Sequence, residues 1–273
     1  MTAIMFPNRL KSLWAEGKPA LNAWCSIGSP FSAEIIAAQG FDSVTIDMQH
    51  GALDYTALLP MFQAMRASGA VLMARVPWLE PGIVMKALDA GAQGIICPMV
   101  DTAEDAARFV SYMRYPPDGQ RSYGPTRAAY AAGPDYVRQA NGGILAFAMV
   151  ETAKAFGNLE AIAATPGLDG IYVGPADLTF SMSAGQLLPG TDREEPEMIA
   201  AIRRIADACP KNGIRAGLHC GTPDYAARAV GWGFDLVTVG GDVGFLASGA
   251  ATAVSGFRGL TGGAAPNSAK SIY

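Results

Sequence analysis

The 273-residue sequence predicts a single-domain (β/α)8 (TIM) barrel, and three observations support this fold class. Eight short apolar segments recur along the chain, and segments with helical spacing separate them. The apolar segments are hydrophobic throughout rather than alternating, which is typical of strands buried on both faces of a parallel sheet. No GxGxxG motif follows the first segment, so a closed barrel is favoured over an open dinucleotide-binding sheet.

Each predicted element follows from this pattern in chain order. The expected strands are residues 20–28, 43–48, 71–76, 94–100, 144–151, 170–175, 215–221 and 235–241. The expected helices are residues 32–40, 55–69, 82–91, 102–114, 153–165, 195–209 and 223–233. Glycines that should provide left-handed C-caps follow several helices, at Gly40, Gly69, Gly91, Gly213 and Gly231.

Two segments depart from a minimal barrel. Residues 115–143 form a long excursion rich in Pro, Gly, Tyr and Arg, which we expect to be an active-site lid or an oligomer contact. Residues 258–273 are rich in small residues and lack periodicity, which predicts a flexible tail. The catalytic barrel is therefore expected to span residues 1–257.

The composition excludes several classes of protein. Hydrophobic residues make up 50% of the chain and charged residues 16%, which is enough for one packed core. The net charge is −4 and Lys and Arg do not cluster, so neither a nucleic-acid surface nor an anionic membrane surface is expected. The sequence shows no secretory signal, no membrane span and no CxxC pair. These features predict a cytoplasmic protein with buried, reduced cysteines.

Two acidic residues follow apolar strands in the second half of the chain. Glu151 closes the segment ILAFAMVE, and Asp177 follows IYVGPA. In a parallel barrel, active sites are built at the carboxyl ends of the strands. Two carboxylates there can bind a hard divalent cation and leave positions open for substrate. The alternative is that both acids only begin helices, where acidic side chains are common.

Other polar residues lie at the ends of earlier strands. His50 follows the second strand, three residues after Asp47, and this spacing lets the carboxylate orient the imidazole. Arg75 interrupts VLMARVPW, and a buried guanidinium needs an anion. That anion is either Asp47 or Glu151, or a developing oxyanion on a substrate. His219 lies within the seventh strand and is expected to be a buried, hydrogen-bonded side chain.

The lysines separate two mechanisms of aldol chemistry. No lysine falls within a predicted strand, where a Schiff-base amine would be expected, and Lys154 reads as the start of a helix. Carbanion chemistry in this chain would therefore need a metal as its electron sink.

The ordered motifs VTIDMQHG, MARVPW, GIICPMV, RYPPDGQRSYGPTRA, MVET and IYVGPADL resemble the HpcH/HpaI family of class II pyruvate aldolases. The resemblance covers roughly residues 5–257 and rests on the whole set rather than on one motif. It implies a (β/α)8 barrel that uses a divalent cation, usually Mg²⁺, Mn²⁺ or Co²⁺. It also implies a homo-oligomer, typically a hexamer formed as a trimer of dimers, in which the last helix packs on a neighbouring subunit.

The resemblance also implies roles for individual residues. Glu151 and Asp177 would bind the metal, His50 would transfer protons with Asp47 as its partner, and Arg75 would stabilise an enolate. The backbone of Gly174, Pro175, Ala176 and Asp177 would bind the pyruvate carboxylate, Trp24 would form the pocket wall, and Asp89 would reach a neighbouring subunit's site. Three positions depart from the common pattern and bear on substrate preference: Gln49 in place of Glu, Met149 in place of Gln, and Ser122 in place of Gly.

The expected function is that of a metal-dependent lyase. It would reversibly cleave 4-hydroxy-2-oxoacids to pyruvate and an aldehyde through an enolate. The same site could instead serve an oxaloacetate decarboxylase or a citryl- or malyl-CoA-type lyase, although no basic cluster for CoA phosphates is present. A non-catalytic barrel that keeps the metal for structure or ligand sensing is the third reading.

Overall fold

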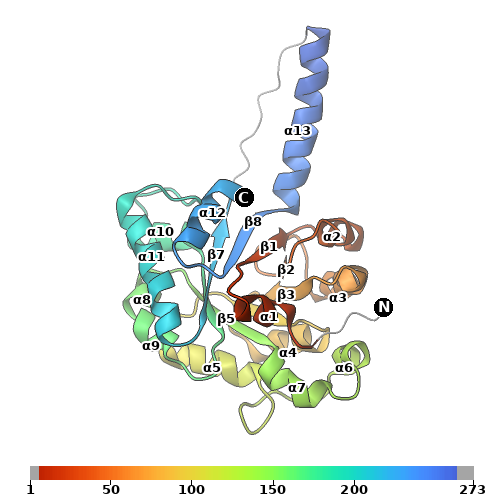
Figure 1. Ribbon diagram of the computed structural model, residues 1–273, viewed down its shortest axis with the longest axis vertical. Helices are drawn as coiled ribbons and strands as arrows, with labels where there is room; N and C mark the ends of the chain where they lie inside the picture. The colour runs from red at the N-terminus through yellow and green to blue at the C-terminus, as the bar shows by residue number, and fades with distance from the viewer. Residues whose placement is uncertain (1–5, 263–273) are drawn as a thin grey trace.

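The computed structural model describes residues 6–262, and its eight parallel strands form one closed barrel (Figure 1). The strands pair in chain order, and β8 returns to pair with β1. They are β1 (Ala20–Cys25), β2 (Ser43–Asp47), β3 (Val71–Arg75), β4 (Gly94–Cys97), β5 (Leu145–Val150), β6 (Gly170–Val173), β7 (Arg215–Cys220) and β8 (Leu236–Gly241). All eight predicted strands are confirmed, and most end one to three residues earlier than the apolar segments do.

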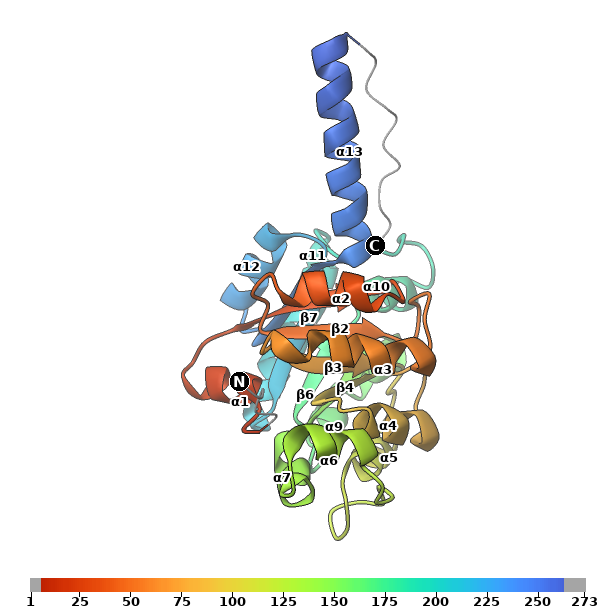
Figure 2. The same ribbon diagram turned by 90° about the vertical axis from the view of Figure 1, so that its right-hand side faces the viewer.

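The described residues form thirteen α-helices and one 3-10 turn, most of which surround the strands on the outside of the barrel (Figure 2). They are α1 (Arg9–Ala15), α2 (Pro30–Ala37), α3 (Tyr55–Ala64), the 3-10 turn η1 (Met65–Ala67), α4 (Pro81–Asp89), α5 (Ala103–Met113), α6 (Thr126–Ala132), α7 (Tyr136–Gly143), α8 (Ala153–Gly157), α9 (Leu159–Ala163), α10 (Pro175–Met182), α11 (Pro196–Lys211), α12 (Pro223–Gly231) and α13 (Asp242–Thr261). Hydroxyl side chains cap several of the helices that follow strands, including Ser29, Thr102, Thr152 and Thr222.

The structure corrects three local predictions. The expected helix 153–165 is two short helices, α8 and α9, which meet at Asn158. The expected long loop 115–143 contains helices α6 and α7. Gly40, Gly69, Gly91 and Gly213 do adopt positive φ angles, but after α12 the left-handed residue is Gly233 (φ 99°) rather than Gly231. The helix ends at Gly231, and Trp232 still has helical angles, so the reversal comes one residue later.

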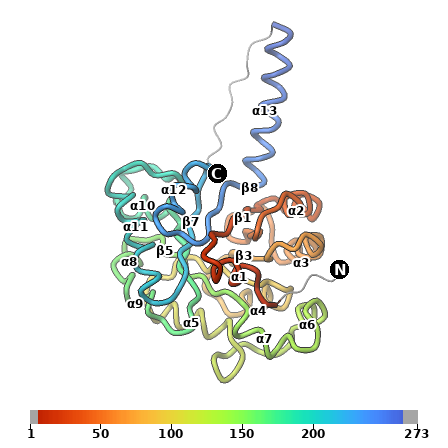
Figure 3. Tube along the Cα trace, viewed as in Figure 1, coloured from red at the N-terminus to blue at the C-terminus, as the bar shows by residue number. Residues whose placement is uncertain are grey.

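The barrel interior is filled by large side chains and is closed at one end. Met73, Phe147 and Tyr172 are fully buried inside the ring of strands. From α1, which lies over the ring in Figure 1, Trp14 packs edge-on against Phe147 with ring centroids 6.2 Å apart. Because α1 closes the amino-terminal end of the strands, only the carboxyl end remains open for a ligand. The chain trace in Figure 3 shows this closed ring.

The last helix has a different environment from the others. α13 leaves the barrel after β8 and projects away from it (Figure 2). Only its first residue, Asp242, is buried, and the Asp242 carboxylate accepts hydrogen bonds from the backbone N–H groups of Ser26 and Ile27. The helix continues to Thr261 and so includes the first four residues of the expected tail, and residues 263–273 of that tail lie outside the described residues.

Two further expectations concern cysteines and membranes. All four cysteines are free and buried, and burial raises the pKa of each thiol, as expected for small apolar core residues. Within residues 6–262, no helix combines the length and the apolar character needed to cross a membrane.

Candidate active site

Asp47 and Arg75 form a buried ion pair at the carboxyl ends of β2 and β3. The two residues are neighbours in the strand register, and the guanidinium holds both carboxylate oxygens, with Nε–Oδ1 2.8 Å and Nη2–Oδ2 2.6 Å. The indole Nε1 of Trp24 donates to the same carboxylate at 3.2 Å. Burial alone would raise the pKa of the Asp47 carboxyl, but the hydrogen bonds and charge of Arg75 outweigh burial and hold this pKa below its usual value. Both members of the pair are therefore charged at neutral pH.

The same carboxylate also shapes the turn that carries His50. Asp47 Oδ1 accepts hydrogen bonds from the backbone N–H groups of Gln49 at 3.0 Å and His50 at 3.3 Å. A Cβ at Gly51 would lie 2.2 Å from the carbonyl oxygen of Asp47, so only glycine fits this turn. The expected bond between Asp47 and the His50 imidazole is not among the hydrogen bonds of residues 6–262. Asp47 instead positions His50 through its backbone, because its oxygens are occupied by Arg75 and Trp24.

Glu151 directly follows β5 and is buried at the mouth of the barrel. Its side chain is held by one oxygen, since Oε1 accepts a hydrogen bond of 2.8 Å from the backbone N–H of Met99, a non-glycine residue with a positive φ of 55°. The other oxygen faces β6, where a Cβ on Gly174 would lie only 2.5 Å from Oε2. Burial, assisted by the negative charge of Asp177, raises the pKa of Glu151 to about 7.

Glu151 and Asp177 together have the chemistry of an open cation site. Asp177 lies in the first turn of α10, and its carboxylate is close enough to Glu151 to raise the pKa of that residue. A divalent cation between them would relieve this repulsion, and oxygen ligands suit Mg²⁺ and Mn²⁺. Among residues 6–262, no cluster of three or more His, Cys, Asp or Glu side chains is arranged to hold a metal. The two carboxylates therefore fit a cation whose remaining ligands come from substrate and water.

A cavity of about 90 Å³ brings most of the predicted site residues together. From the predicted set it is lined by Trp24, His50, Arg75, Glu151, Gly174, Pro175, Ala176 and Asp177. Asp47 lies behind Arg75, bound to its guanidinium. These residues come from the carboxyl ends of β1, β2, β3, β5 and β6, which the barrel topology brings to one face.

Asp89 is not part of this cavity. Its carboxylate accepts a 2.8 Å hydrogen bond from Arg121, a residue of the 115–143 excursion. The Arg121 side chain is fully buried, and its Cζ lies 4.4 Å from the ring of Tyr115. Within one chain, Asp89 therefore anchors the excursion to α4.

Sequence reasoning missed one wall of the cavity. His219, Pro189, Gly190 and Thr191 also line it, beside Met149, a position that the sequence had already linked to substrate preference. His219 was expected to be buried within β7, yet it lies two residues beyond Gly217, whose register partner on β6 is Tyr172, an inward-facing side chain. The strict alternation of side chains along a strand would have placed His219 inside the barrel mouth.

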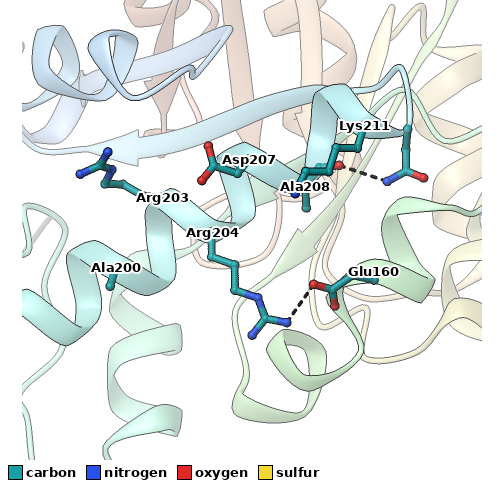
Figure 4. Close-up of a pocket in the computed structure, with 8 residues that line it drawn as sticks. Glu160, Ala200, Arg203, Arg204, Asp207, Ala208 and Lys211 are labelled. Carbon is teal, nitrogen blue, oxygen red and sulfur yellow. Dashed lines mark hydrogen bonds and ion pairs between the residues drawn. The ribbon is translucent and has the colours of Figure 1, made fainter.

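A separate hollow lies on the outside of the barrel, between α9 and α11 (Figure 4). In it, Arg204 forms an ion pair of 2.8 Å with Glu160, while Arg203, Asp207 and Lys211 extend from the same helix. None of the strand-end residues described above reaches this hollow. We therefore place the active site at the carboxyl ends of the strands.

A parallel barrel with a buried arginine and two carboxylates at the carboxyl ends of its strands is typical of an enzyme. Comparison with known proteins identifies which enzymes share it. The sequence model of the HpcH/HpaI aldolase/citrate lyase family matches residues 21–248. A hydroxypyruvate/pyruvate aldolase from Rhizorhabdus wittichii is 36% identical over 253 residues, covering 93% of this chain and all of that protein.

Two further relatives agree with this match. A 5-keto-4-deoxy-D-glucarate aldolase from Klebsiella pneumoniae is 35% identical over 250 residues, covering 91% of this chain and 96% of that protein. The crystal structure of an HpcH/HpaI aldolase/citrate lyase family protein from Burkholderia cenocepacia aligns with a TM-score of 0.84 and 33% identity, covering 92% of this chain and 99% of that one. This chain belongs to the HpcH/HpaI aldolase/citrate lyase family. It is an aldolase-type carbon–carbon lyase, and dependence on a divalent metal is general in the family.

Proposed function

We propose that this aldolase reversibly cleaves 4-hydroxy-2-oxoacids to pyruvate and an aldehyde, with Mg²⁺, Mn²⁺ or Co²⁺ held by Glu151 and Asp177. One observation carries the proposal: both carboxylates, Arg75 and His50 line a single small cavity at the open end of the barrel. The names of the two aldolase relatives support cleavage that yields pyruvate. The bound cation would supply a positive charge that stabilises the enolate of pyruvate.

Arg75 would stabilise the same developing negative charge from the protein side. Its Nε and Nη2 groups are committed to Asp47, whereas Nη1 makes no hydrogen bond with any residue in the range 6–262. The rigid pair fixes the direction of the remaining N–H groups, and a preorganised donor of this kind is worth far more than a mobile one. Asp47 is thus a positioning residue for Arg75.

The amino terminus of α10 would bind the carboxylate of pyruvate. The N-cap residue is Gly174, which has no side chain to occupy the first N–H groups of the helix. The N–H groups of Ala176 and Asp177 therefore remain for an anion, in the field of the helix dipole. Trp24, packed against Arg75, would form the facing wall.

His50 would take the proton from the hydroxyl group of the 4-hydroxy-2-oxoacid as the carbon–carbon bond breaks, and would return a proton to the enolate carbon that becomes the methyl group of pyruvate. Its side chain is exposed and lines the cavity, so it can exchange protons with solvent between turnovers. The Asp47-anchored turn fixes its backbone, which limits where the imidazole can reach.

No lysine lines the cavity, and Lys154 is exposed with its Nζ 3.7 Å from Asp101. The deciding experiment measures pyruvate release from a 4-hydroxy-2-oxoacid, before and after EDTA treatment and after addition of Mg²⁺ or Mn²⁺. We expect EDTA to abolish the activity and the cations to restore it. Activity that survives EDTA but is trapped by borohydride would contradict the proposal, because it would indicate a Schiff base.

The decarboxylation of oxaloacetate is a second reaction that the same residues would support, since it passes through the same enolate. A CoA thioester substrate is less well matched. Arg75 is the single lysine or arginine among the residues that line this cavity, and it is bound to Asp47. Steady-state comparison of oxaloacetate, malyl-CoA and hydroxyketoacids separates the three activities.

The projecting α13 supports a homo-oligomer, for which we propose a hexamer built as a trimer of dimers. Exposed apolar side chains recur along this helix, at Val243, Leu246, Val254 and Phe257. Their spacing of 3, 8 and 3 residues places them within roughly 80° of arc on one face. An apolar stripe of this length on a helix that leaves its own barrel suits packing against another copy of the chain.

A further inference from the structure

His219 separates the catalytic cavity from a second, larger one. The adjoining cavity, of about 460 Å³, lies over the ends of β7 and β8 and the start of α13. Trp24, Thr191 and His219 line both cavities and therefore form their common wall. A substrate bound to the catalytic carboxylates and extending toward β8 would pass this wall.

A chain of hydrogen bonds through the barrel core ends at His219. It begins at buried Asn22, whose Oδ1 accepts from the hydroxyls of Ser43 and Thr45 and whose Nδ2 donates to Thr238 Oγ1 at 2.9 Å. The Thr238 hydroxyl lies 2.6 Å from the hydroxyl of Tyr172, which lies 3.3 Å from Nδ1 of His219.

This chain is compatible with a neutral His219 that carries its proton on Nε2. Thr238 Oγ1 accepts from Asn22, and when it gives its own proton to Tyr172, the Tyr172 proton is available to Nδ1. An imidazole that accepts at Nδ1 carries its proton on Nε2. Burial and the positive charge of Arg75 lower the pKa of His219 to about 4, so the ring is neutral at pH 7.

The second cavity has a lining that suits neutral, hydroxylated molecules. Hydroxyl groups line it at Ser26 and Thr191, and also at Thr222 and Ser248, whose hydroxyls already donate to Asp192 and to the Phe245 carbonyl. Asp192 and Asp242 also line it, and it contains no lysine or arginine. The two acids disfavour an anionic substituent, while the Ser26 and Thr191 hydroxyls offer hydrogen bonds to an alcohol.

We propose that His219 selects the aldehyde partner of the reaction, by donating a hydrogen bond from Nε2 to a hydroxyl oxygen beside the aldehyde carbon. The substrate class is a neutral hydroxyaldehyde, such as glycolaldehyde or glyceraldehyde, rather than an apolar or acidic aldehyde. The inference rests on the proposed function, because it places pyruvate on the carboxylate side of the cavity. Tyr172 is the positioning residue that holds His219 in the donor form.

The test compares aldol synthesis from pyruvate with glycolaldehyde, propanal and succinic semialdehyde. Propanal replaces the glycolaldehyde hydroxyl by a methyl group of similar size, so the ratio of the two kcat/KM values isolates the hydroxyl contact. In His219→Phe, which keeps an aromatic ring against Trp24, we expect this ratio to fall about 3- to 10-fold, the range for one neutral hydrogen bond. His219→Gln restores an N–H donor and should recover most of the ratio. An unchanged ratio in His219→Phe, or a wild-type preference for succinic semialdehyde over glycolaldehyde, would overturn the proposal.

A second measurement tests the hydrogen-bond chain without catalysis. Nitrogen-15 NMR of the wild-type imidazole should show the proton on Nε2 at pH 7, and Tyr172→Phe should shift the ring toward a mixture of tautomers. A proton on Nδ1 in the wild type would contradict the donor role. If the wild type neither forms an aldol product nor decarboxylates oxaloacetate, the proposed function itself fails, and the assignment of an aldehyde to His219 fails with it. If the wild type is active but substitution of His219 leaves the glycolaldehyde-to-propanal ratio of kcat/KM unchanged, the role of His219 is refuted and the proposed function stands.

Discussion

Arg75 has one edge of its guanidinium bound to Asp47 and the other directed to the cavity, and this division explains why a lysine cannot replace it. An ammonium group has no planar fork, so it cannot hold both Asp47 oxygens and also present a fixed donor. In Arg75→Lys we expect kcat/KM for cleavage to fall about 10²- to 10³-fold, as on loss of one oxyanion donor.

Steady-state kinetics with pyruvate as product inhibitor checks this expectation. The inhibition constant of pyruvate should change much less than kcat, because in the proposed site the carboxylate binds at the amino terminus of α10 rather than at Arg75. Arg215→Lys is the matched control, since Arg215 forms a partly exposed ion pair with Asp235 at the opposite end of the barrel. Equal kinetics in Arg75→Lys and Arg215→Lys would contradict the role of Arg75.

Substitution of His50 should impair proton transfer, which is a different step from the one impaired in Arg75→Lys. His50→Ala removes the proton carrier at the cavity, and a positioned general base typically contributes about 10²- to 10⁴-fold. Exchange of the methyl protons of pyruvate into deuterated water, followed by NMR, should slow together with the aldol rate. If exchange continued at the wild-type rate in His50→Ala, another base would have to transfer the proton.

His219 makes the free energy of unfolding depend on pH. Its pKa is about 4 in the folded chain because of burial and Arg75, against about 6.5 in an unfolded chain. Between these values the unfolded state binds a proton that the folded state does not, so the free energy of unfolding falls as the pH drops from 6.5 to 4. We expect His219→Phe to lose less stability than the wild type between pH 7 and pH 5 in urea denaturation.

Comparing the two proteins at each pH separates His219 from its neighbours. Asp47, Arg75, Tyr172 and Trp24 face the ring in both. The raised pKa of Glu151 acts with the opposite sign, because the folded state then binds the extra proton, and it is common to both proteins. Identical pH profiles would contradict this prediction, because they would show that the pKa of His219 is the same in the folded and the unfolded chain.

At the scale of elements, the cation site depends on the end of β5 and the start of α10. Replacement of Glu151 or Asp177 by Ala would remove one of the two proposed anionic ligands, while the apolar core between strands and helices is left intact. Calorimetric titration with Mn²⁺ should show at least tenfold weaker binding in each variant, with an unchanged circular dichroism spectrum. Asp224→Ala is the control, because Asp224 also follows a proline in the first turn of a helix, α12, outside the cavity. Wild-type affinity in both site variants would refute the assignment.

The excursion 115–143 is a second element whose behaviour follows from its contacts. It is fixed to the barrel by Arg121, which lies between the rings of Tyr115 and Tyr136 and binds Asp89. A buried charge with a partner of this kind is costly to disrupt, because the remaining charge stays buried. The segment is therefore a folded excursion fixed to the outside of the barrel rather than a free lid.

For the whole molecule, the open question of assembly centres on α13. Leu246→Glu together with Phe257→Glu places two charges on its apolar stripe and should shift the protein toward smaller species in light-scattering chromatography. Thr252→Glu adds a charge about 180° away from the stripe and should leave the assembly intact. If both variants kept the wild-type mass, the stripe would not be the contact between subunits.

The barrel, and the residues that converge at its open end, could be predicted from the sequence. Strand periodicity and helix spacing are local properties, and in a parallel barrel they place Glu151, Asp177 and Arg75 at one face. The partners of these residues could not be predicted, because they lie far apart in the chain. Arg75 binds the Asp47 carboxylate, so the Asp47 oxygens are not available to the His50 ring. Arg121 binds Asp89. Tyr172 on β6 lies within hydrogen-bond distance of His219 in the cavity wall. Each of these contacts depends on how neighbouring strands and loops are brought together, and no local pattern encodes that.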